Sequence, residues 1–336
     1  MARSKPDKVL IAVAREHTVR DDVIDVVHWS QSVEESLRNK GYDCEIFYVS
    51  REDLKDAPGL FKRLRDINPQ CVFNLFEGFS DDSGKEIDFA RFLEKTDIPF
   101  TGESFRTLGF CLNKSQLKVL LKRNGIHVPR GVLIKTTMDA ANVRIDPPLF
   151  VKPAFEDASL GIDEDSLVTR LIDLPNAVTH KLRVFPSGLL VEEFISGKEY
   201  SVGFLGKELL GISVIDYSFF KSMSPFLTYA SKWDRKSREF KLLMPVVEKG
   251  IDEILRERII NLSQKVGKVL KCRSYFRLDW REKEGKLFLL DVNPNPDIGR
   301  ESGFMRQAAH KGFDNDDVVA RIVQIALKGH KASGRE

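Results

Sequence analysis

The first hundred residues alternate between short apolar runs and longer amphipathic stretches. KVLIAV, CEIFYVS and CVFNLF each have the continuous apolar character of a strand buried on both faces, and IPFTG ends the series as a shorter strand. Between these runs the apolar residues recur with helical spacing over 21–40, 59–67 and 86–95, and Gly41 predicts the end of the first helix. Strands that alternate with helices predict an α/β unit with a small doubly wound parallel sheet.

The pattern changes after Lys114. A helix is predicted over 114–124, followed by the short strands GVLI and PLFVKP and by a helical stretch around 164–184. GLLVEEFI, EYSVGFLG and LLGISVID then follow closely enough to predict a meander of antiparallel strands. The polar stretch 218–245 is long enough to form a mobile cover. The last predicted elements are a helix over 248–270, a hairpin over 274–293 and a helix over 314–328.

Composition narrows the class of protein. The length of 336 residues predicts two or three domains, and 42% apolar with 31% charged residues is typical of a globular chain. A net charge of +3 is too small for a nucleic-acid-binding surface, so we expect no nucleic-acid partner. The longest early apolar run, VLIAVA, is too short for a signal segment or a membrane span. Four widely spaced cysteines without metal-ligand or redox spacing indicate buried thiols, and we expect a cytoplasmic protein with no membrane contact.

The segment YFRLDWREKEGKLFLLDVNPNPD holds the most informative polar residues. If its two strands pair antiparallel about Gly285, Asp279 lies opposite Asp291 and Arg277 lies opposite Asn293. Two facing carboxylates repel each other unless a positive charge lies between them, and with an amide oxygen they make hard ligands suited to magnesium. The alternative is an ordinary hairpin with two solvent-facing acids.

Two further segments carry charged residues inside apolar runs. In PLFVKPAFEDASLGI, Lys152 ends a strand, and the small residues after it, including Ser159, can bring backbone amides close to phosphate oxygens. The alternative is a lysine that extends from the strand end into solvent, and Lys114 taken alone is a surface lysine. In GLLVEEFISGKEY the acids can accept hydrogen bonds from an amine or from ribose hydroxyls, or else they protect a strand edge. These acids are Glu192, Glu193 and Glu199.

Competing motifs are incomplete. GFSDDSGK differs from a phosphate-binding P-loop in its glycine spacing and in Glu86, which stands where a Ser or Thr would meet magnesium. There is no GxGxxG after the first strand, no GxSxG elbow and no HExxH pair.

Taken in order, these segments resemble the ATP-grasp superfamily and, within it, the D-alanine–D-alanine ligase branch. The resemblance spans nearly the whole chain through VFNLFEG with IPFTG, LNKSQLKVLLKRNGIHVP, LFVKP, LLVEEFISGKEYSV, LTYASKW, and FRLDW with DVNPNPD. It implies an N-terminal α/β domain over 1–104, a central ATP-grasp subdomain over 105–186 and a C-terminal subdomain over 187–330. The C-terminal subdomain would carry a lid over 218–245 and the metal hairpin.

The resemblance also implies roles for individual residues. Lys114 and Lys152 would contact ATP phosphates, and Lys232 in the lid would reach the γ-phosphate. Arg277 would steady the phosphoryl group, and Ser302 would bind the carboxylate of the second substrate. The residues expected to hold the nucleotide and two Mg²⁺ ions, or Mn²⁺ in their place, are Ser159 in the phosphate loop, Glu192, Glu193, Phe194 and Ile195 around the adenine, Glu199 at the ribose, and Asp279, Asp291 and Asn293 at the metals.

Departures from the family pattern concentrate in the substrate pocket. AREHTVRDD replaces a glycine-rich serine loop, Glu77-Gly78 replaces His-Gly, EDAS replaces an EGSS-type loop, Asp291 replaces a glutamate, and Asp297 replaces a glycine. The expected substrate wall comprises residues 15–22, 77–86 and 297–306.

The sequence therefore predicts an ATP-dependent ligase that joins a small-molecule carboxylate to an amine through an acyl phosphate. It would join either two amino acids or an amino acid and another carboxylate. A D-alanine–D-alanine ligase and a catalytically silent ATP-binding module stay open as alternatives, and the resemblance allows a homodimer.

Overall fold

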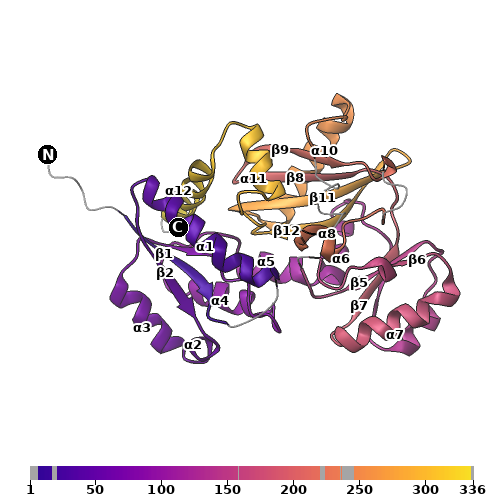
Figure 1. The fold of residues 1–336 in the computed structure, drawn as a ribbon, viewed down its shortest axis with the longest axis horizontal. Helices are drawn as coiled ribbons and strands as arrows, with labels where there is room; N and C mark the ends of the chain where they lie inside the picture. The colour runs from indigo at the N-terminus through magenta and orange to yellow at the C-terminus, as the bar shows by residue number, and fades with distance from the viewer. Residues whose placement is uncertain are drawn as a thin grey trace.

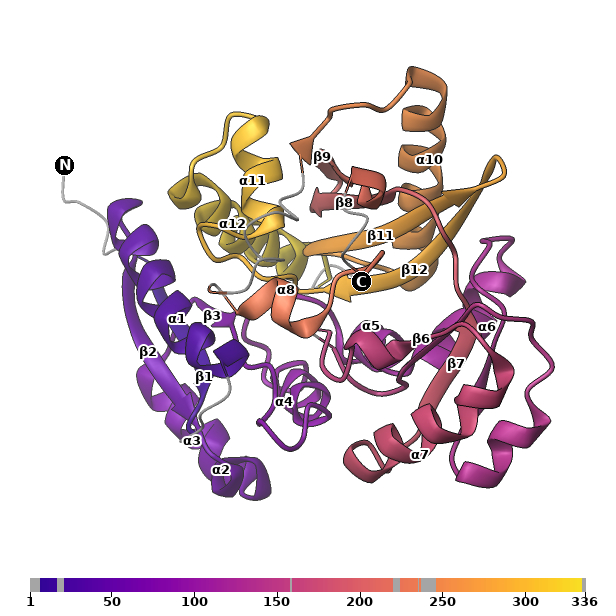
Figure 2. The same cartoon turned by 45° about the vertical axis from the view of Figure 1, so that its right-hand side comes forward.

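The computed structural model describes residues 7–16, 21–157, 159–219, 224–234, 236 and 246–333. Within these ranges, three sheets carry the fold, each covered by helices (Figure 1). The sheets of the N-terminal, central and C-terminal parts of the chain surround a common middle, which Figure 2 shows from a second direction. None of the helices in the described part of the chain is long and apolar enough to cross a membrane.

The N-terminal sheet is parallel and has the strand order β2-β1-β3. The elements are β1 (Lys8–Ala14), α1 (Asp21–Asn39), β2 (Asp43–Val49), α2 (Arg51–Lys55), α3 (Ala57–Ile67), β3 (Cys71–Asn74) and α4 (Lys85–Leu93). This confirms the predicted doubly wound arrangement, and Gly41 follows the end of α1 with a φ of 86°. The strand expected at IPFTG is reduced to one isolated bridge between Val72 and Phe100.

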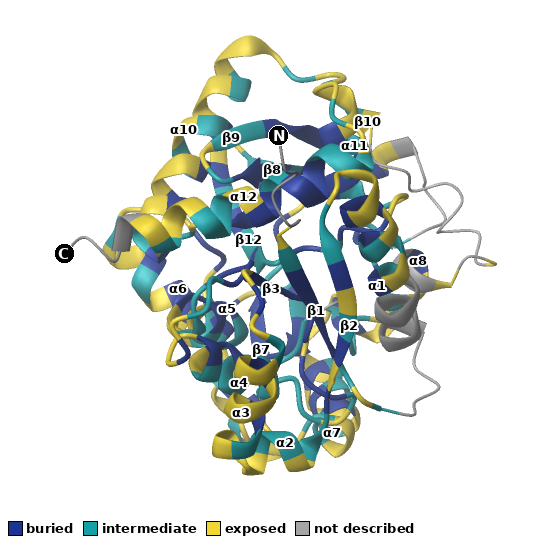
Figure 3. Ribbon diagram, turned by 90° about the vertical axis from the view of Figure 1, so that its left-hand side faces the viewer, coloured by how far each residue is buried: buried dark blue, intermediate teal, exposed yellow. Residues whose placement is uncertain are grey.

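Both faces of this sheet are buried, as Figure 3 shows along β1 and β3. Leu10 and Ala12 of β1 pack toward α3 and α4 on one face. Val9 and Ile11 pack on the other face in a cluster completed by Ile322 of α12 (Asn315–Ser333). Helix α12 also lies against α1, so it completes the core on this face of the N-terminal sheet.

The central part is a four-stranded antiparallel sheet in the order β4-β7-β5-β6, with α7 packed against it. Its elements are α5 (Phe105–Leu112), α6 (Lys114–Arg123), β4 (Gly131–Ile134), η1 (Thr137–Asn142), β5 (Leu149–Pro153), η2 (Glu164–Ser166), β6 (Leu167–Val168), η3 (Leu171–Asp173), α7 (Leu174–Val184) and β7 (Leu189–Glu193). The helix predicted around 164–184 is therefore continuous only in its second half.

The C-terminal part is a five-stranded antiparallel sheet in the order β10-β9-β8-β11-β12, covered by α10. Its elements are β8 (Glu199–Leu205), β9 (Glu208–Ile215), η4 (Tyr217–Phe219), α8 (Tyr229–Trp233), β10 (Val246–Val247), α10 (Glu253–Leu270), β11 (Tyr275–Lys283), β12 (Lys286–Pro294), α11 (Gly303–His310) and α12.

The predicted three-strand meander is wrong at its first strand. β8 and β9 do form an antiparallel pair, but β7 lies in the central sheet between β4 and β5. Both edges of β7 are hydrogen-bonded there, so it has no free edge for β8. The chain crosses from one sheet to the other at Gly197, which has a φ of 117° and leaves no room for a Cβ beside the Glu282 carbonyl.

A buried carboxylate joins the N-terminal part to β11. Glu103 is 0% exposed and accepts hydrogen bonds from the backbone N–H groups of Arg273 and Ser274 at 2.8–3.0 Å. The Ser274 hydroxyl in turn accepts from the backbone N–H of Gly102 at 3.0 Å. Burial raises the pKa of Glu103 to about 7, even though these N–H groups favour the charged form.

We predict that Glu103 makes stability depend on pH. Because its pKa is about 7 when folded and about 4.5 as a free side chain, the folded chain binds the extra proton between these values. The contribution of Glu103 to the free energy of unfolding is complete below the pKa of the free side chain. As pH rises from there to 7, this contribution falls by a few kcal/mol, on the order of one kcal/mol for each pH unit. Urea unfolding of the wild type and Glu103→Gln at pH 5, 6, 7 and 8 measures the difference. A difference that stays constant with pH would contradict the assignment.

Candidate active site

The β11–β12 hairpin has the predicted register. Asp279 pairs with Asp291 and Arg277 pairs with Asn293, so the two acids lie on one face of neighbouring strands. A β-bulge follows: Trp280 pairs with Leu289, and Leu290 has no cross-strand partner on β11. The Leu290 carbonyl instead accepts a hydrogen bond from the Lys152 Nζ at 3.4 Å. The hairpin therefore presents both acids and the Leu290 carbonyl toward the central sheet.

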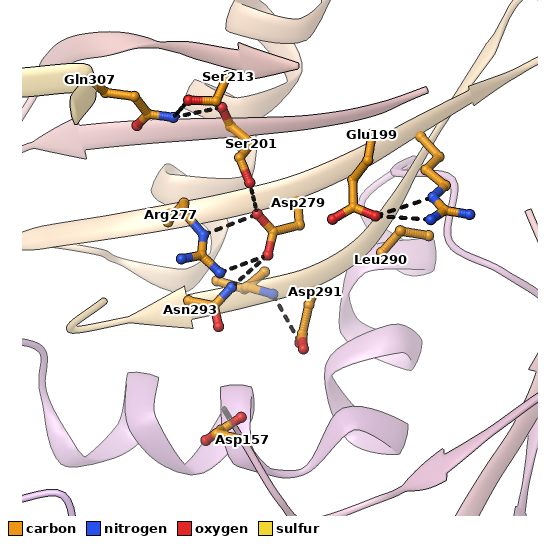
Figure 4. A network of polar contacts seen from close by, with 12 residues as sticks. Asp157, Glu199, Ser201, Ser213, Arg277, Asp279, Leu290, Asp291, Asn293 and Gln307 are labelled. Atoms are coloured by element: carbon orange, nitrogen blue, oxygen red, sulfur yellow. Dashed lines mark hydrogen bonds and ion pairs between the residues drawn. The ribbon is translucent and has the colours of Figure 1, made fainter. Parts of the chain in front are cut away.

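Asp279 is held by donors from three directions (Figure 4). The Arg277 guanidinium donates to both carboxylate oxygens at 3.0 Å, the Asn293 Nδ2 donates at 2.9 Å, and the Ser201 hydroxyl also donates. Behind it, the Gln307 Nε2 donates to the Ser201 carbonyl at 2.9 Å. Asp279 is 8% exposed, so the alternative of a solvent-facing acid is wrong for this residue.

Half-buried Asp291 forms an ion pair with the buried Lys114. The Lys114 Nζ lies 3.0 Å from Asp291 and 3.2 Å from Asp157, and the lysine is buried at the first position of α6. The interpretation of Lys114 as a surface lysine is therefore wrong. Burial lowers the pKa of Lys114, but the carboxylates of Asp291 and Asp157 raise it by a larger amount. The pKa of Lys114 therefore lies above its usual value. Both members of the pair are charged, because Lys114 and Lys152 also lower the pKa of Asp291 against the effect of burial.

Two lysines share the buried carboxylate of Glu192. Its oxygens lie 3.0 Å from the Nζ of Lys152 and 2.7 Å from the Nζ of Lys118. Lys152 does not extend into solvent, and Glu192 lies in the inner strand β7 rather than at an edge, so both of those alternatives are wrong. Lys118 was not foreseen, although it lies four residues after Lys114 and hence on the same face of α6. Burial lowers its pKa to about 8.

These groups open onto a cleft of about 830 Å³ between the central and C-terminal sheets, which we call the main cleft. Its apolar wall includes the rings of Phe150, Phe194 and Phe226, with Phe226 edge-on to Phe150 at a centroid distance of 5.0 Å. Of the residues whose side chains are described, the lining contains every one expected to bind the nucleotide, together with the three expected metal ligands. These are Lys114, Lys152, Ser159, Glu192, Glu193, Phe194, Ile195, Glu199, Asp279, Asp291 and Asn293.

Arg281 is a wall residue that sequence reasoning missed. It is 2% exposed and its guanidinium donates to Glu199 at 3.0 Å, to the Ile195 carbonyl at 2.8 Å and to the Pro225 carbonyl at 2.7 Å. Tyr217 donates to the same Glu199 oxygen at 3.1 Å. Its position two residues after Asp279 could have indicated this role, because side chains two residues apart lie on the same face of a strand such as β11.

The remaining expected residues lie in different places. Arg277 contacts the main cleft through Asp279, whereas Ser302 is the N-cap of α11, where its hydroxyl accepts from the Met305 N–H at 3.2 Å. Glu193 lines the main cleft and also pairs with Arg130 at 3.2 Å. The Lys232 side chain and much of the predicted lid over 218–245 lie outside the described residues, but Phe226 and Leu227 from that stretch line the main cleft.

The donor set at the hairpin fits a divalent cation that is shared with a ligand. Asp279, Asp291 and Asn293 offer two carboxylates and an amide oxygen, which are the hard donors that magnesium prefers. Among the described residues, no group of three or more His, Cys, Asp or Glu side chains could hold a metal on its own. A cation here would therefore take further ligands from water or from phosphate oxygens.

Two antiparallel sheets that enclose a cleft with buried lysines and a paired-acid hairpin define an ATP-grasp fold. The chain belongs to the D-alanine–D-alanine ligase family, an ATP-dependent ligase family, because the family model described as the D-ala D-ala ligase C-terminus matches residues 120–324.

Individual proteins agree with this membership. The chain is 28% identical over 298 residues to a D-alanine–D-alanine ligase of Neisseria meningitidis serogroup A, with 88% of this chain and 90% of that protein covered. It is 27% identical over 304 residues to the enzyme of that name from Actinobacillus succinogenes, with 88% and 91% covered. The crystal structure of D-alanine–D-alanine ligase from Bacillus anthracis complexed with ATP matches with a TM-score of 0.73 at 20% identity, covering 98% of this chain and 100% of that one.

We predict that Arg281 contributes to nucleotide affinity. Arg281→Lys keeps the positive charge but loses the forked contacts that hold Glu199 and the Ile195 and Pro225 carbonyls. The dissociation constant for ATP should rise about tenfold, as expected for the loss of charge-assisted hydrogen bonds. Calorimetric titration with ATP measures it, and Arg170→Lys is the matched control, because Arg170 makes a forked contact with Asp173 on the exposed surface. An unchanged dissociation constant would show that these contacts do not shape the nucleotide pocket.

Proposed function

We propose that the chain is an ATP-dependent ligase that joins the carboxylate of one amino acid to the amine of another and releases ADP and phosphate. The observation that carries this proposal is the convergence in the main cleft of the expected nucleotide and metal residues, drawn from α6, β5, β7, β11 and β12. The names of the relatives support amino acids as the substrates.

The proposed reaction has two steps. A substrate carboxylate oxygen attacks the γ-phosphorus of ATP, the bond to the bridging oxygen breaks, and ADP leaves. The amine nitrogen of the second substrate then attacks the carbonyl carbon of the acyl phosphate, phosphate leaves, and the nitrogen loses a proton to solvent. The protein positions the reactants and neutralises charge on the phosphoryl group, which is the main contribution of protein groups to phosphoryl transfer.

The charged groups of the cleft suit this task. Lys114, Lys152 and Lys232 would contact phosphate oxygens, and Arg277 would steady the phosphoryl group and the acyl intermediate. Asp279, Asp291 and Asn293 would hold magnesium, which supplies electrostatic stabilisation of the phosphate charge when bound. Without nucleotide, Lys114 and Lys152 are held in place by the carboxylates of Asp291 and Glu192.

A second candidate is D-alanine ligation itself, which the names of the relatives favour. The altered residues of the pocket argue for a different amino-acid pair. Glu77 and Asp297, where the family pattern has histidine and glycine, both line a second cavity beside the hairpin. Ser302 would bind the carboxylate of the second substrate.

We predict ADP release that depends on amino acids. The full chain is incubated with ATP, Mg²⁺ and a panel of D- and L-amino acids, singly and in pairs, and ADP release is followed together with mass spectrometry of products. Release above the background without amino acid, with a condensed product, supports the proposal. Release that requires D-alanine, with D-alanyl-D-alanine as product, favours the second candidate. Tight ATP binding without ADP release for any pair would contradict a ligase and indicate a silent ATP-binding module.

We predict that Asp279→Asn lowers kcat for ADP release at least about a hundredfold, the scale expected when one group that stabilises transition-state charge is removed. The substitution keeps the shape of the side chain but removes the charge that pairs with Arg277. Glu284→Gln in the exposed turn of the same hairpin is the matched control and should keep the wild-type rate. Unaltered turnover in folded Asp279→Asn would refute the role of Asp279.

A further inference from the structure

An acid in the loop after β5 contacts the first expected phosphate lysine. We call residues 154–163, which connect β5 to η2, the β5–η2 loop. The residues of this loop that line the main cleft are Glu156, Asp157, Ser159, Leu160 and Ile162. Asp157 stands where the EGSS-type pattern of the family has its glycine, so its carboxylate is a feature of this chain. The Oδ1 of Asp157 lies 3.2 Å from the Lys114 Nζ.

Carboxylate oxygens engage the whole ammonium group of Lys114. An ammonium group carries three N–H donors. The two carboxylate oxygens of Asp291 lie 3.0 and 3.2 Å from the Lys114 Nζ, and Asp157 supplies the third contact. Because Lys114 is 5% exposed, its Nζ has little room for a further partner. A phosphate oxygen that contacts Lys114 must therefore replace one of these carboxylate oxygens.

Of the two acids, Asp157 is the one that can move away. Asp291 belongs to β12, pairs with Asp279 across the hairpin, and accepts a hydrogen bond from the Val292 N–H at 3.1 Å. Asp157 lies in a loop instead (Figure 4), and 40% of its side chain is exposed against 27% for Asp291. Its carboxylate can therefore rotate into water, where it is solvated again.

The backbone keeps Asp157 close to Lys114. The Lys114 N–H donates to the Ala154 carbonyl at 3.2 Å, and the Ala154 N–H donates to the Gly188 carbonyl at 3.1 Å, so the start of the β5–η2 loop is fixed. The Leu160 N–H donates to the Asp157 carbonyl at 2.9 Å, which closes a turn directly after the acid. A carboxylate that is tethered beside its lysine competes with free ligands at a high effective concentration.

We propose that Asp157 sets the affinity of the main cleft for nucleotide phosphates, because its carboxylate takes the place of a phosphate oxygen on Lys114 and has to be displaced on binding. This inference rests on the proposed function, which places the phosphates at Lys114. A carboxylate oxygen and a phosphate oxygen are both anionic acceptors, so they compete for the same N–H donor. The displaced carboxylate also stays near the phosphates and repels them. Both effects weaken the binding of phosphate and leave the binding of the nucleoside unchanged.

The test compares two ligands that differ in phosphate. ATP and adenosine are titrated calorimetrically into the full chain with Mg²⁺ present, for the wild type and for Asp157→Asn, which keeps the size of the side chain and removes its charge. We expect the dissociation constant for ATP to fall about fivefold, the scale of one partly exposed ion pair, and that for adenosine to stay the same. An unchanged or higher dissociation constant for ATP overturns the inference, and so does equal tightening for adenosine.

Asp163→Asn is the matched control. Asp163 ends the same loop and pairs with the buried Lys181 at 2.6 Å, and neither of them is among the described residues that line the main cleft. This variant removes one negative charge from the loop and keeps the contacts of Lys114, so ATP binding should not tighten. Equal tightening in both variants would mean that net charge alone is responsible, which overturns the assignment to the contact with Lys114.

Magnesium distinguishes displacement from metal binding. Displacement predicts that Asp157→Asn binds ATP more tightly than the wild type both with Mg²⁺ and with EDTA in its place. If Asp157 were instead a ligand of Mg²⁺, the variant would bind ATP more weakly in the presence of Mg²⁺. Tighter binding under both conditions supports the inference, and weaker binding that appears only with Mg²⁺ overturns it.

The inference and the proposed function can fail separately. ADP release with amino-acid pairs tests the ligase, whereas ATP affinity tests Asp157. Tighter ATP binding by Asp157→Asn, without ADP release for any pair, supports the inference and contradicts the ligase. ADP release together with an unchanged dissociation constant for ATP does the reverse. Absence of ATP binding in both the wild type and the variant overturns both.

Discussion

The ion pair between Lys114 and Asp291 is the contact on which the geometry of the main cleft depends. It joins the first turn of α6 to β12. Along the chain, most strands of the two antiparallel sheets lie between these two elements. A buried lysine is tolerated only with a negative partner, and a buried carboxylate needs a positive one. The neighbouring pair of Lys152 with Glu192 repeats this arrangement between β5 and β7. The cleft is thus lined by charges that neutralise one another and that a polyanion with its cations can engage.

Local pattern was sufficient to predict much of the fold. The parallel sheet followed from apolar runs alternating with helical spacing, and the pairing of Asp279 with Asp291 followed from the position of Gly285 in the turn. Pairing in a hairpin is fixed by its turn, so sequence proximity carries the information. The separation of β7 from β8 was missed because two consecutive strands have the same sequence pattern whether they pair with each other or belong to different sheets.

Some residues of the candidate site could be predicted from the sequence, and others could not. The residues of the main cleft were identified because they stand in recognisable motifs, and they do line one cavity. Lys118 and Arg281 were missed because their importance comes from burial beside Glu192 and Glu199, which charge patterning along the chain does not reveal. Asn74, at the end of β3, was missed as well. The sequence does not reveal that its amide is buried with its Nδ2 lacking a hydrogen-bond partner among the described residues.

The packing of α12 on the first sheet has a consequence for synthesis. Val9 and Ile11 share a core cluster with Ile322, which follows them by some three hundred residues in the chain. Until α12 has been synthesised, one face of the nascent N-terminal sheet lacks its final cover. The core of this sheet is therefore complete only after the central and C-terminal sheets have been translated.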